Sequence, residues 1–202
     1  MNTLDAIKSR RAIKHYDPTF KISEKDLDYL LEHMLESPTS FNLQHWRFVL
    51  IDDKNLRKQI REAAWGQEQV TDASLLFILC ADTKAWEKSP EQYWKDSPIE
   101  TKEMMVPMIK DFYQDKEQLQ RDEALRSVGI AAQTTMLAAK AMAYDSCPMI
   151  GFDHQKVAEL IKLPHDHIIG MMLVIGKATK PAWPKSGQLT IDEVLVRNKF
   201  DT

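Results

Sequence analysis

Two uninterrupted apolar runs constrain the fold of this chain more than any other feature. Residues 75–80 and 168–175 have the length of strands, and neither run alternates polar with apolar side chains. A strand that is apolar on both sides must be covered on both sides. The shorter run 48–51 indicates one more buried strand. We therefore expect a central sheet with both faces covered.

Helical spacing marks the segments between these strands. Ser23 can cap a helix because Asp26 follows three residues later, and apolar side chains then recur with helical spacing as far as Leu35. We expect further helices over residues 55–64 and 122–144. The last of these is apolar around much of its circumference and rich in small residues. It should be buried on more than one side, and it could pack against a second copy of itself.

Composition and charge limit the possible functions. A chain of 202 residues can bury a core without disulfides or metal, and we expect one domain. The net charge of −3 does not indicate a protein that binds nucleic acid or an anionic membrane. The N-terminus lacks the pattern of a secretory signal, and no run has membrane-spanning length, so we expect a cytoplasmic protein. Cys80 and Cys147 lie among apolar residues, which favours buried thiols over a disulfide or a catalytic pair.

Several common site motifs are missing from the sequence. His165 and His167 stand two residues apart without a further ligand pair at a recognisable spacing, so we expect a solvated turn and no metal. The sequence has no serine elbow, no Cys-x-x-Cys and no phosphate-binding glycine fingerprint, and it contains only 6 glycines. These absences argue against the usual hydrolase and dinucleotide-binding folds.

A basic segment near the N-terminus has the residue types that hold a phosphate. In an extended chain Arg10, Ala12 and Lys14 point the same way, because side chains alternate with period two. A guanidinium fork and a compact ammonium on one side suit a dianionic phosphomonoester. The alternative is a solvated basic turn, which is common on protein surfaces.

A polar loop follows one helix later, over residues 37–46. Pro38 prevents simple continuation of the helix, and Thr39, Ser40 and Asn42 supply donors and acceptors within a few residues. Such a loop suits the polar edge of a planar ligand. The alternative is an ordinary polar turn in front of a buried strand.

Two further segments are predicted to lie outside the main body. Residues 84–121 are charged and aromatic, with Pro98 and Pro107 expected to interrupt any long helix. They would form a peripheral helical excursion that could lid a site, or a surface hairpin of helices. Residues 181–202 form a tail that prolines extend and that must lie across something. Thr190 in this tail begins a capping-box pattern.

Taken together, these motifs resemble the FMN-dependent nitroreductase family of NAD(P)H-dependent flavin oxidoreductases. The resemblance covers nearly the whole chain, is weakest around residues 84–121, and depends on the order and spacing of five motifs. They are Ser9-Arg10-Arg11-Ala12-Ile13-Lys14, the polar loop 37–46, Asp72-Ala73-Ser74, Pro148-Met149-Ile150-Gly151-Phe152 and the Pro184-Lys185-Ser186 tail motif.

The resemblance implies an α+β fold with a central, mostly antiparallel sheet flanked by helices, in a single domain over residues 1–202. It also implies an intertwined homodimer in which the long helix forms the interface and the tail crosses to the partner subunit. Two FMN molecules would lie at that interface, each contacted by both chains.

The resemblance further assigns roles to individual residues. The phosphate would be held by Arg10, Lys14 and Lys185, with Arg11 and Ala12 alongside. The polar loop would contribute Pro38, Thr39, Ser40 and Asn42. The ring's polar edge or the ribityl chain would be near Gln67 and Gln69. One ring face would be covered by Pro148, Met149, Ile150 and Gly151, with an amide of Ile150 or Gly151 facing N5. The candidates for the substrate face are Phe41, Phe112 and Tyr113, and no side chain is required as a catalytic acid or base.

Two positions depart from the family pattern. Many relatives have a serine where this chain has Ala12, and many have an arginine in the tail where it has Gly187 or Gln188. Phosphate binding would then depend more on the three remaining cations.

The implied activity is a ping-pong transfer of electrons from NADH or NADPH to a nitroaromatic, a quinone or a similar electron-poor acceptor. One alternative is a flavin-binding redox sensor or carrier without reductase turnover. A more distant alternative is a helical interaction protein that binds no cofactor.

Overall fold

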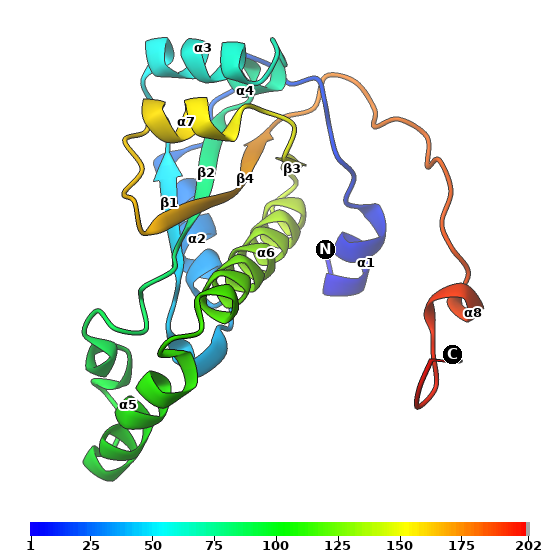
Figure 1. Cartoon of the computed structure of the whole chain (residues 1–202). Coiled ribbons are helices and arrows are strands. Elements are labelled where there is room, and N and C mark those ends of the chain that lie inside the picture. The colour runs from blue at the N-terminus through cyan, green and yellow to red at the C-terminus, as the bar shows by residue number, and fades with distance from the viewer. Residues whose placement is uncertain (201–202) are drawn as a thin grey trace.

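The computed structural model describes residues 1–200, which are organised around one four-stranded sheet (Figure 1). The strand order is β1-β2-β4-β3, and each neighbouring pair is antiparallel. The strands are β1 (Trp46–Leu50), β2 (Leu75–Asp82), β3 (Asp145–Met149) and β4 (His167–Gly176). The predicted α+β fold with a mostly antiparallel sheet is confirmed.

Helices connect and cover these strands. The α-helices are α1 (Thr3–Ser9), α2 (Glu24–Leu35), α3 (Lys54–Ala63), α4 (Gln69–Asp72), α5 (Ile99–Tyr113), α6 (Glu117–Ala141), α7 (His154–Leu160) and α8 (Ile191–Val194). The 3-10 helices are η1 (Ser40–Asn42) and η2 (Pro90–Trp94). The long helix expected over 122–144 is present, but it begins five residues earlier and ends three residues earlier.

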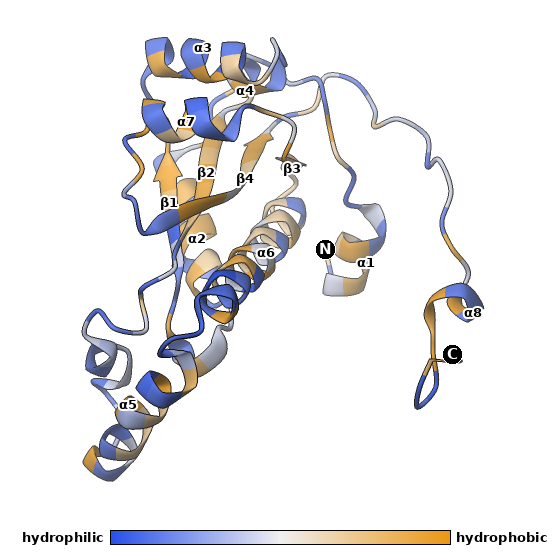
Figure 2. Ribbon diagram, viewed as in Figure 1, coloured by the Kyte–Doolittle hydropathy of each residue, from blue (hydrophilic) through white to orange (hydrophobic). Residues whose placement is uncertain are grey.

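The sheet carries a hydrophobic core on each face, as Figure 2 shows by the apolar colouring of the strands and of the helix sides toward them. Ile78 of β2 packs in a cluster with residues of α3, α4 and α7. The next residue, Leu79, packs in a second cluster with residues of α2 and α6. Every residue of β2 is buried, which confirms the prediction from its uninterrupted apolar run. Full burial of each large apolar side chain stabilises the fold by roughly 1.5–3 kcal/mol.

Helix α2 begins where the sequence predicted, because the Ser23 hydroxyl accepts a hydrogen bond of 3.1 Å from the Asp26 amide. It ends at Leu35, and its C-terminal end leads into the polar loop. Since α2 is fixed to the sheet by buried Leu30 and Met34, the loop is held by a rigid element.

A third hydrophobic cluster lies outside the sheet. It contains Leu43 and Trp86 together with Ile109 and Tyr113 of α5. The expectation that Pro107 interrupts any long helix here is wrong, because α5 runs through it for 15 residues. Pro107 and Glu103, the residue four positions earlier, are both exposed. Water can therefore satisfy the carbonyl that a proline leaves without a donor.

The C-terminal tail leaves the body of the protein after β4 (Figure 1). It is extended as far as Thr190, whose hydroxyl and amide pair with Glu193 in the predicted capping box at the start of α8. Trp183 is 72% exposed along this tail, and Ile191 of α8 is equally exposed. Residues 201–202, the end of the predicted tail, lie outside the described part of the chain. Within residues 1–200, no helix combines the length and the apolar character needed to cross a membrane.

Candidate functional site

The N-terminal basic segment lies along edge strand β3. The Ile13 amide donates to the Ser146 carbonyl at 3.1 Å, and Ala12 forms a parallel bridge with the same residue. This pairing brings the Lys14 ammonium to 3.4 Å from the Cys147 sulfur. Burial raises the pKa of the Cys147 thiol, and the charges of Lys14 and Arg10 oppose that shift. The positive charges of Lys14 and Arg10 are therefore both close enough to Cys147 of β3 to influence its thiol.

A glutamine pair joins the connection between α3 and α4 to the turn after β3. The Gln67 amide donates to the Gly151 carbonyl at 2.8 Å, and Gln69 donates to the Gln67 side-chain oxygen at 2.9 Å. A Cβ added to Gly151 would lie 3.3 Å from Cζ3 of Trp65, so a larger residue would crowd that ring. Ile150 beside it is 71% exposed. The polar side chains and the open backbone turn therefore lie next to one another.

A hollow of about 530 Å³ lies beside Lys14 and the two glutamines. Its lining includes Lys14, His15, Trp183 and the connection 65–69 between α3 and α4. The Arg11 guanidinium donates to the carbonyl of Trp183, which fixes the start of the tail to the rim. We call the following set the basic half-site: Arg10, Lys14, Gln67, Gln69, Pro148, Met149, Ile150 and Gly151. The sequence reasoning missed Trp65 and Trp183, although a tryptophan between two prolines was a usable signal.

The polar loop has a different environment. The Thr39 hydroxyl accepts from the Gln44 amide at 2.9 Å, and the Asn42 amide group donates to the Tyr93 carbonyl at 2.8 Å. Phe41 and Asn42 adopt left-handed backbone angles, with φ of 53° and 55°. Such angles are unfavourable for a phenylalanine, and strained residues of this kind concentrate at ligand sites. The loop, with Pro38 and Ser40 at its start, therefore contacts the excursion of residues 84–121.

The three predicted substrate residues come together beside this loop. The Phe41 ring lies 5.2 Å from that of Phe112 and 6.0 Å from that of Tyr113. Phe112 is 42% exposed, whereas Tyr113 is fully buried. Their role in substrate binding stays a prediction, but the buried Tyr113 exposes no surface to a substrate in this chain.

The basic half-site and the polar loop flank opposite edges of the sheet. The basic half-site is built on β3, and the polar loop leads into β1, which are the two outer strands in the order β1-β2-β4-β3. Neighbouring strands are about 4.8 Å apart, so the two edges are separated by roughly 14 Å. The predicted cofactor residues are therefore divided between two regions of one chain.

Lys185 lies in neither region. It is exposed in the extended part of the tail, and within residues 1–200 its ammonium has no hydrogen bond or ion pair. Its predicted contact with a phosphate would require that the tail reach another surface.

The basic half-site fits a phosphorylated, planar cofactor such as FMN. Within the described residues, neither Arg10 nor Lys14 forms an ion pair, and the Lys14 ammonium has only a thiol as its partner. Two cations that form no ion pair are suited to a dianionic phosphate, although the hollow beside them is also lined by Glu68. The glutamine amides and the backbone turn at Gly151 provide neighbouring polar groups for a ring edge.

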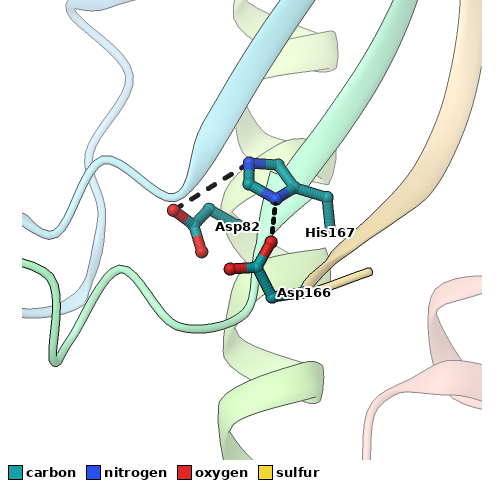
Figure 3. Close-up of side chains that lie close together, drawn as sticks. All are labelled: Asp82, Asp166 and His167. Carbon is teal, nitrogen blue, oxygen red and sulfur yellow. Dashed lines mark hydrogen bonds and ion pairs between the residues drawn. The ribbon is translucent and has the colours of Figure 1, made fainter. Parts of the chain in front are cut away.

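A separate cluster of charged residues lies where β2 ends and β4 begins (Figure 3). A His167 ring nitrogen lies 2.7 Å from an Asp166 oxygen, and the other lies 3.9 Å from Asp82. The Lys88 ammonium lies 3.0 Å from both Asp82 oxygens and also pairs with Asp166. Lys88 pairs with both carboxylates, and the Arg47 guanidinium lies 3.5 Å from Asp82, so the cluster is an ion-pair network that connects the excursion to the sheet.

The expectation of a solvated turn around His167 is wrong. Its side chain is only 13% exposed, because it begins strand β4 and lies against Asp82. Asp82 is 84 residues earlier in the chain than Asp166, and no local spacing could have linked the two residues. His165, by contrast, is exposed.

Comparison with known proteins assigns the chain to a family. A sequence model of the Nitroreductase family matches residues 7–177. The chain belongs to the nitroreductase family. Protein DrgA of Synechocystis sp. is 54% identical over 182 residues, which cover 90% of this chain and 87% of that protein. YodC of Bacillus subtilis, provisionally named an NAD(P)H nitroreductase, is 32% identical over 198 residues, covering 96% and 97% of the two chains.

Solved nitroreductase-type structures share the fold. A protein of Exiguobacterium sibiricum, crystallised in complex with FMN, superposes with a TM-score of 0.90 at 28% identity, covering 98% of both chains. The Bacillus subtilis protein ydfN superposes with a TM-score of 0.89 at 28% identity, covering 96% of this chain and 97% of that chain. The resemblance inferred from the sequence motifs is confirmed.

Proposed function

We propose that this nitroreductase family member is an FMN-dependent oxidoreductase. It takes electrons from NADH or NADPH and passes them to a nitroaromatic, a quinone or a similar electron-poor acceptor. The observation that carries the proposal is the pair of cations, Arg10 and Lys14, held without carboxylate partners beside the Gln67–Gly151 hydrogen bond. The FMN complex of the Exiguobacterium sibiricum neighbour supports the choice of cofactor.

Each group of residues has its own part in holding FMN. Arg10, Lys14 and Lys185 hold the phosphate, with Arg11 and Ala12 beside it. The polar edge or the ribityl chain is held by Gln67 and Gln69 of one chain and by Pro38, Thr39, Ser40 and Asn42 of the other. The turn Pro148-Met149-Ile150-Gly151 covers one ring face. When bound, FMN supplies the hydride acceptor and the electron donor of the reaction, while the protein positions it and excludes water.

We propose a homodimer, because the two regions lie at opposite edges of the sheet of one chain. A second copy would place the polar loop of one subunit beside the basic half-site of the other. Large apolar side chains exposed on α6, α1 and the tail support this assembly, among them Ile130, Ile7 and Ile191. Such exposed apolar positions are typical of an interaction surface. The tail would then cross to the partner subunit.

A ping-pong order follows if the electron donor and the electron acceptor bind at the same face of the flavin ring. In this proposal the nicotinamide donor leaves before the acceptor binds, so both use the same position in turn. The exposed ring of Phe112 and the partly buried ring of Phe41 would line that position. No side chain needs to act as an acid or a base for this chemistry.

The test is a visible absorption spectrum of the purified protein with added FMN, before and after NADH or NADPH. We expect a bound-flavin spectrum that bleaches with the nucleotide and recovers when a nitroaromatic or quinone is added under argon. Continued consumption of the nucleotide would establish turnover. A flavin that stays reduced in the presence of both acceptors would support the alternative of a redox sensor or carrier. A protein that takes up no FMN would overturn the proposal.

A further inference from the structure

A second basic hollow lies at the N-terminal end of α3. It has a volume of about 450 Å³, and four cationic side chains line it together with one carboxylate, Asp52. The cations are Lys21, Lys54, Arg57 and Lys58. Their sum with Asp52 is +3, whereas the whole chain has a net charge of −3. This local excess of positive charge is opposite in sign to the protein as a whole.

The fixed point of this hollow is the buried guanidinium of Arg57. Only 8% of the residue is exposed, and it donates to three backbone carbonyls, of Ile51 at 2.9 Å, Ala73 at 2.8 Å and Ser74 at 3.2 Å. A guanidinium has five N–H donors, so two remain for another acceptor. All three partners are neutral, and although the charge of Asp52 acts on this guanidinium, no carboxylate of residues 1–200 forms an ion pair with it.

The lysines of the hollow add charge that the fold itself does not use. Lys54 and Lys58 are four residues apart on α3, and like charges at this spacing destabilise a helix. Within residues 1–200, neither they nor Arg57 form an ion pair. An anion bound among them would relieve this repulsion. Lys21 approaches from the N-terminal segment, where its ammonium lies 3.4 Å from the Pro18 carbonyl.

This hollow is distinct from the basic half-site. The hollow beside Lys14 is at the C-terminal end of α3, where Trp65 and Gly66 follow the helix, and no residue lines both hollows. Thr71 of this hollow and Gln69 of the other both belong to α4, so the two hollows are neighbours, but they share no lining residue. An anion at the N-terminal end of α3 would therefore leave the proposed cofactor position free.

We propose that the second basic hollow binds the dianionic phosphate group of a small metabolite. Arg57 supplies a rigid pair of donors, and the three lysines supply mobile positive charge around it. The carboxylate of Asp52 repels anions, so a ligand with one phosphate and no further anionic group should fit this hollow best. This site is independent of the proposed reductase function.

The test is a ³¹P NMR titration of the full-length protein with one FMN per chain, so that the basic half-site is occupied and no free FMN competes for the second hollow. Inorganic phosphate and adenosine 5′-monophosphate are the two probes. We expect the phosphorus signal of each probe to broaden on binding. If the phosphate alone is recognised, the two probes should have similar affinities. If the nucleoside also contributes, adenosine 5′-monophosphate should bind at lower concentrations than inorganic phosphate. Absence of binding by both probes up to roughly 10 mM would overturn the proposal. The readout is the signal of the added probe, so failure to take up FMN would not be mistaken for failure of this site.

Matched variants locate the binding. The double variant Lys54→Ala and Lys58→Ala removes two exposed charges, and we expect it to weaken phosphate binding roughly tenfold. The control, Lys25→Ala and Lys95→Ala, removes the same charge from exposed positions outside both hollows, and its binding should equal that of the parent. Equal weakening in both double variants would overturn the assignment. An Arg57→Lys variant that folds should also bind more weakly, because it keeps the charge and loses the fork of donors.

Discussion

The Lys14 ammonium and the Cys147 thiol lie 3.4 Å apart, joining the N-terminal segment to edge strand β3. A thiol is a weak acceptor, and burial raises the pKa of this one, so it stays neutral at pH 7. The positive charge of Lys14 is therefore held at a fixed position without being neutralised. This arrangement makes Lys14 the most direct test of the proposed phosphate contact.

Replacement of Lys14 by glutamine should weaken FMN binding about 10- to 100-fold. A hydrogen bond to a charged group contributes roughly 1.5–3 kcal/mol, and glutamine keeps a polar side chain of similar length without the charge. The measurement is quenching of FMN fluorescence on titration with protein. Lys95→Gln, at an exposed position of the excursion, is the control and should bind like the parent. Equal affinities of the Lys14→Gln protein and the parent would contradict the assignment.

Much of the fold could be predicted from local patterns. The uninterrupted run of β2 indicated a strand covered on both faces, and Ser23 with Asp26 located the start of α2. These signals are local, because burial and capping are properties of a few consecutive residues. Pro107 misled the same reasoning, since the penalty of a proline in a helix depends on whether water can reach the freed carbonyl.

The less predictable features depend on contacts between distant segments. The network of Asp82, Lys88, Asp166 and His167 forms only because β2 and β4 are paired, which places residue 82 opposite residue 167. The division of the candidate site also follows from strand order, since β1 and β3 are the outer strands. No spacing within the sequence encodes that order. The order of the motifs predicted the site residues, while the sheet topology determines which of them one chain can bring together.

Replacement of Lys88 by methionine should lower the free energy of unfolding at pH 7 by about 1 kcal/mol. The Lys88 side chain is 44% exposed, which weakens its ion pairs, but Asp82 is 3% exposed and would lose its nearest cation. Hydrogen bonds from Lys88 and His167 hold the pKa of Asp166 well below its usual range. Stability from this group is present above about pH 4 and is lost as the pH falls further. Urea denaturation should therefore show a shallower acid decline in the variant. Lys95→Met is the control, and a parallel decline in all three proteins would contradict the role of the network.

Acidification should destabilise the protein through His45 before the carboxylates are protonated. His45 is 1% exposed, its ring nitrogen lies 3.0 Å from the Ser127 hydroxyl, and burial lowers its pKa from 6.5 to about 4. Only the unfolded chain then binds a proton between these values. The contribution of neutral, buried His45 to stability is complete above pH 6.5 and is lost as the pH falls toward 4. Between pH 6.5 and 5 the free energy of unfolding should fall by about 2 kcal/mol from this residue.

The check on His45 is a series of urea denaturation curves from pH 7.5 to roughly pH 5. His45→Gln should be less stable than the parent at pH 7, because it changes a buried contact, yet its free energy of unfolding should change less with pH. The difference in slope corresponds to about one proton. Identical slopes in the two proteins would show that His45 does not titrate in this way.

Mixed dimers can decide whether Lys185 serves the phosphate of its own chain or of the partner. We expect the tail to cross, so that Lys14 of one subunit and Lys185 of the other meet at each FMN. A dimer of one parent chain and one chain carrying both Lys14→Ala and Lys185→Ala would then have two damaged sites. If the tail instead served its own chain, the same dimer would keep one intact site.

Differently tagged chains allow the mixed dimer to be purified, and its FMN titration gives the number of tight sites. The expected result is none with the affinity of the parent, because each site lacks one of its two lysine charges. The control is a dimer in which one chain carries Lys25→Ala and Lys95→Ala, which should keep two. One tight site per mixed dimer would show that Lys14 and Lys185 of the same chain act together. That result would remove the crossing tail from the proposal, while the assignment of Lys14 would stand.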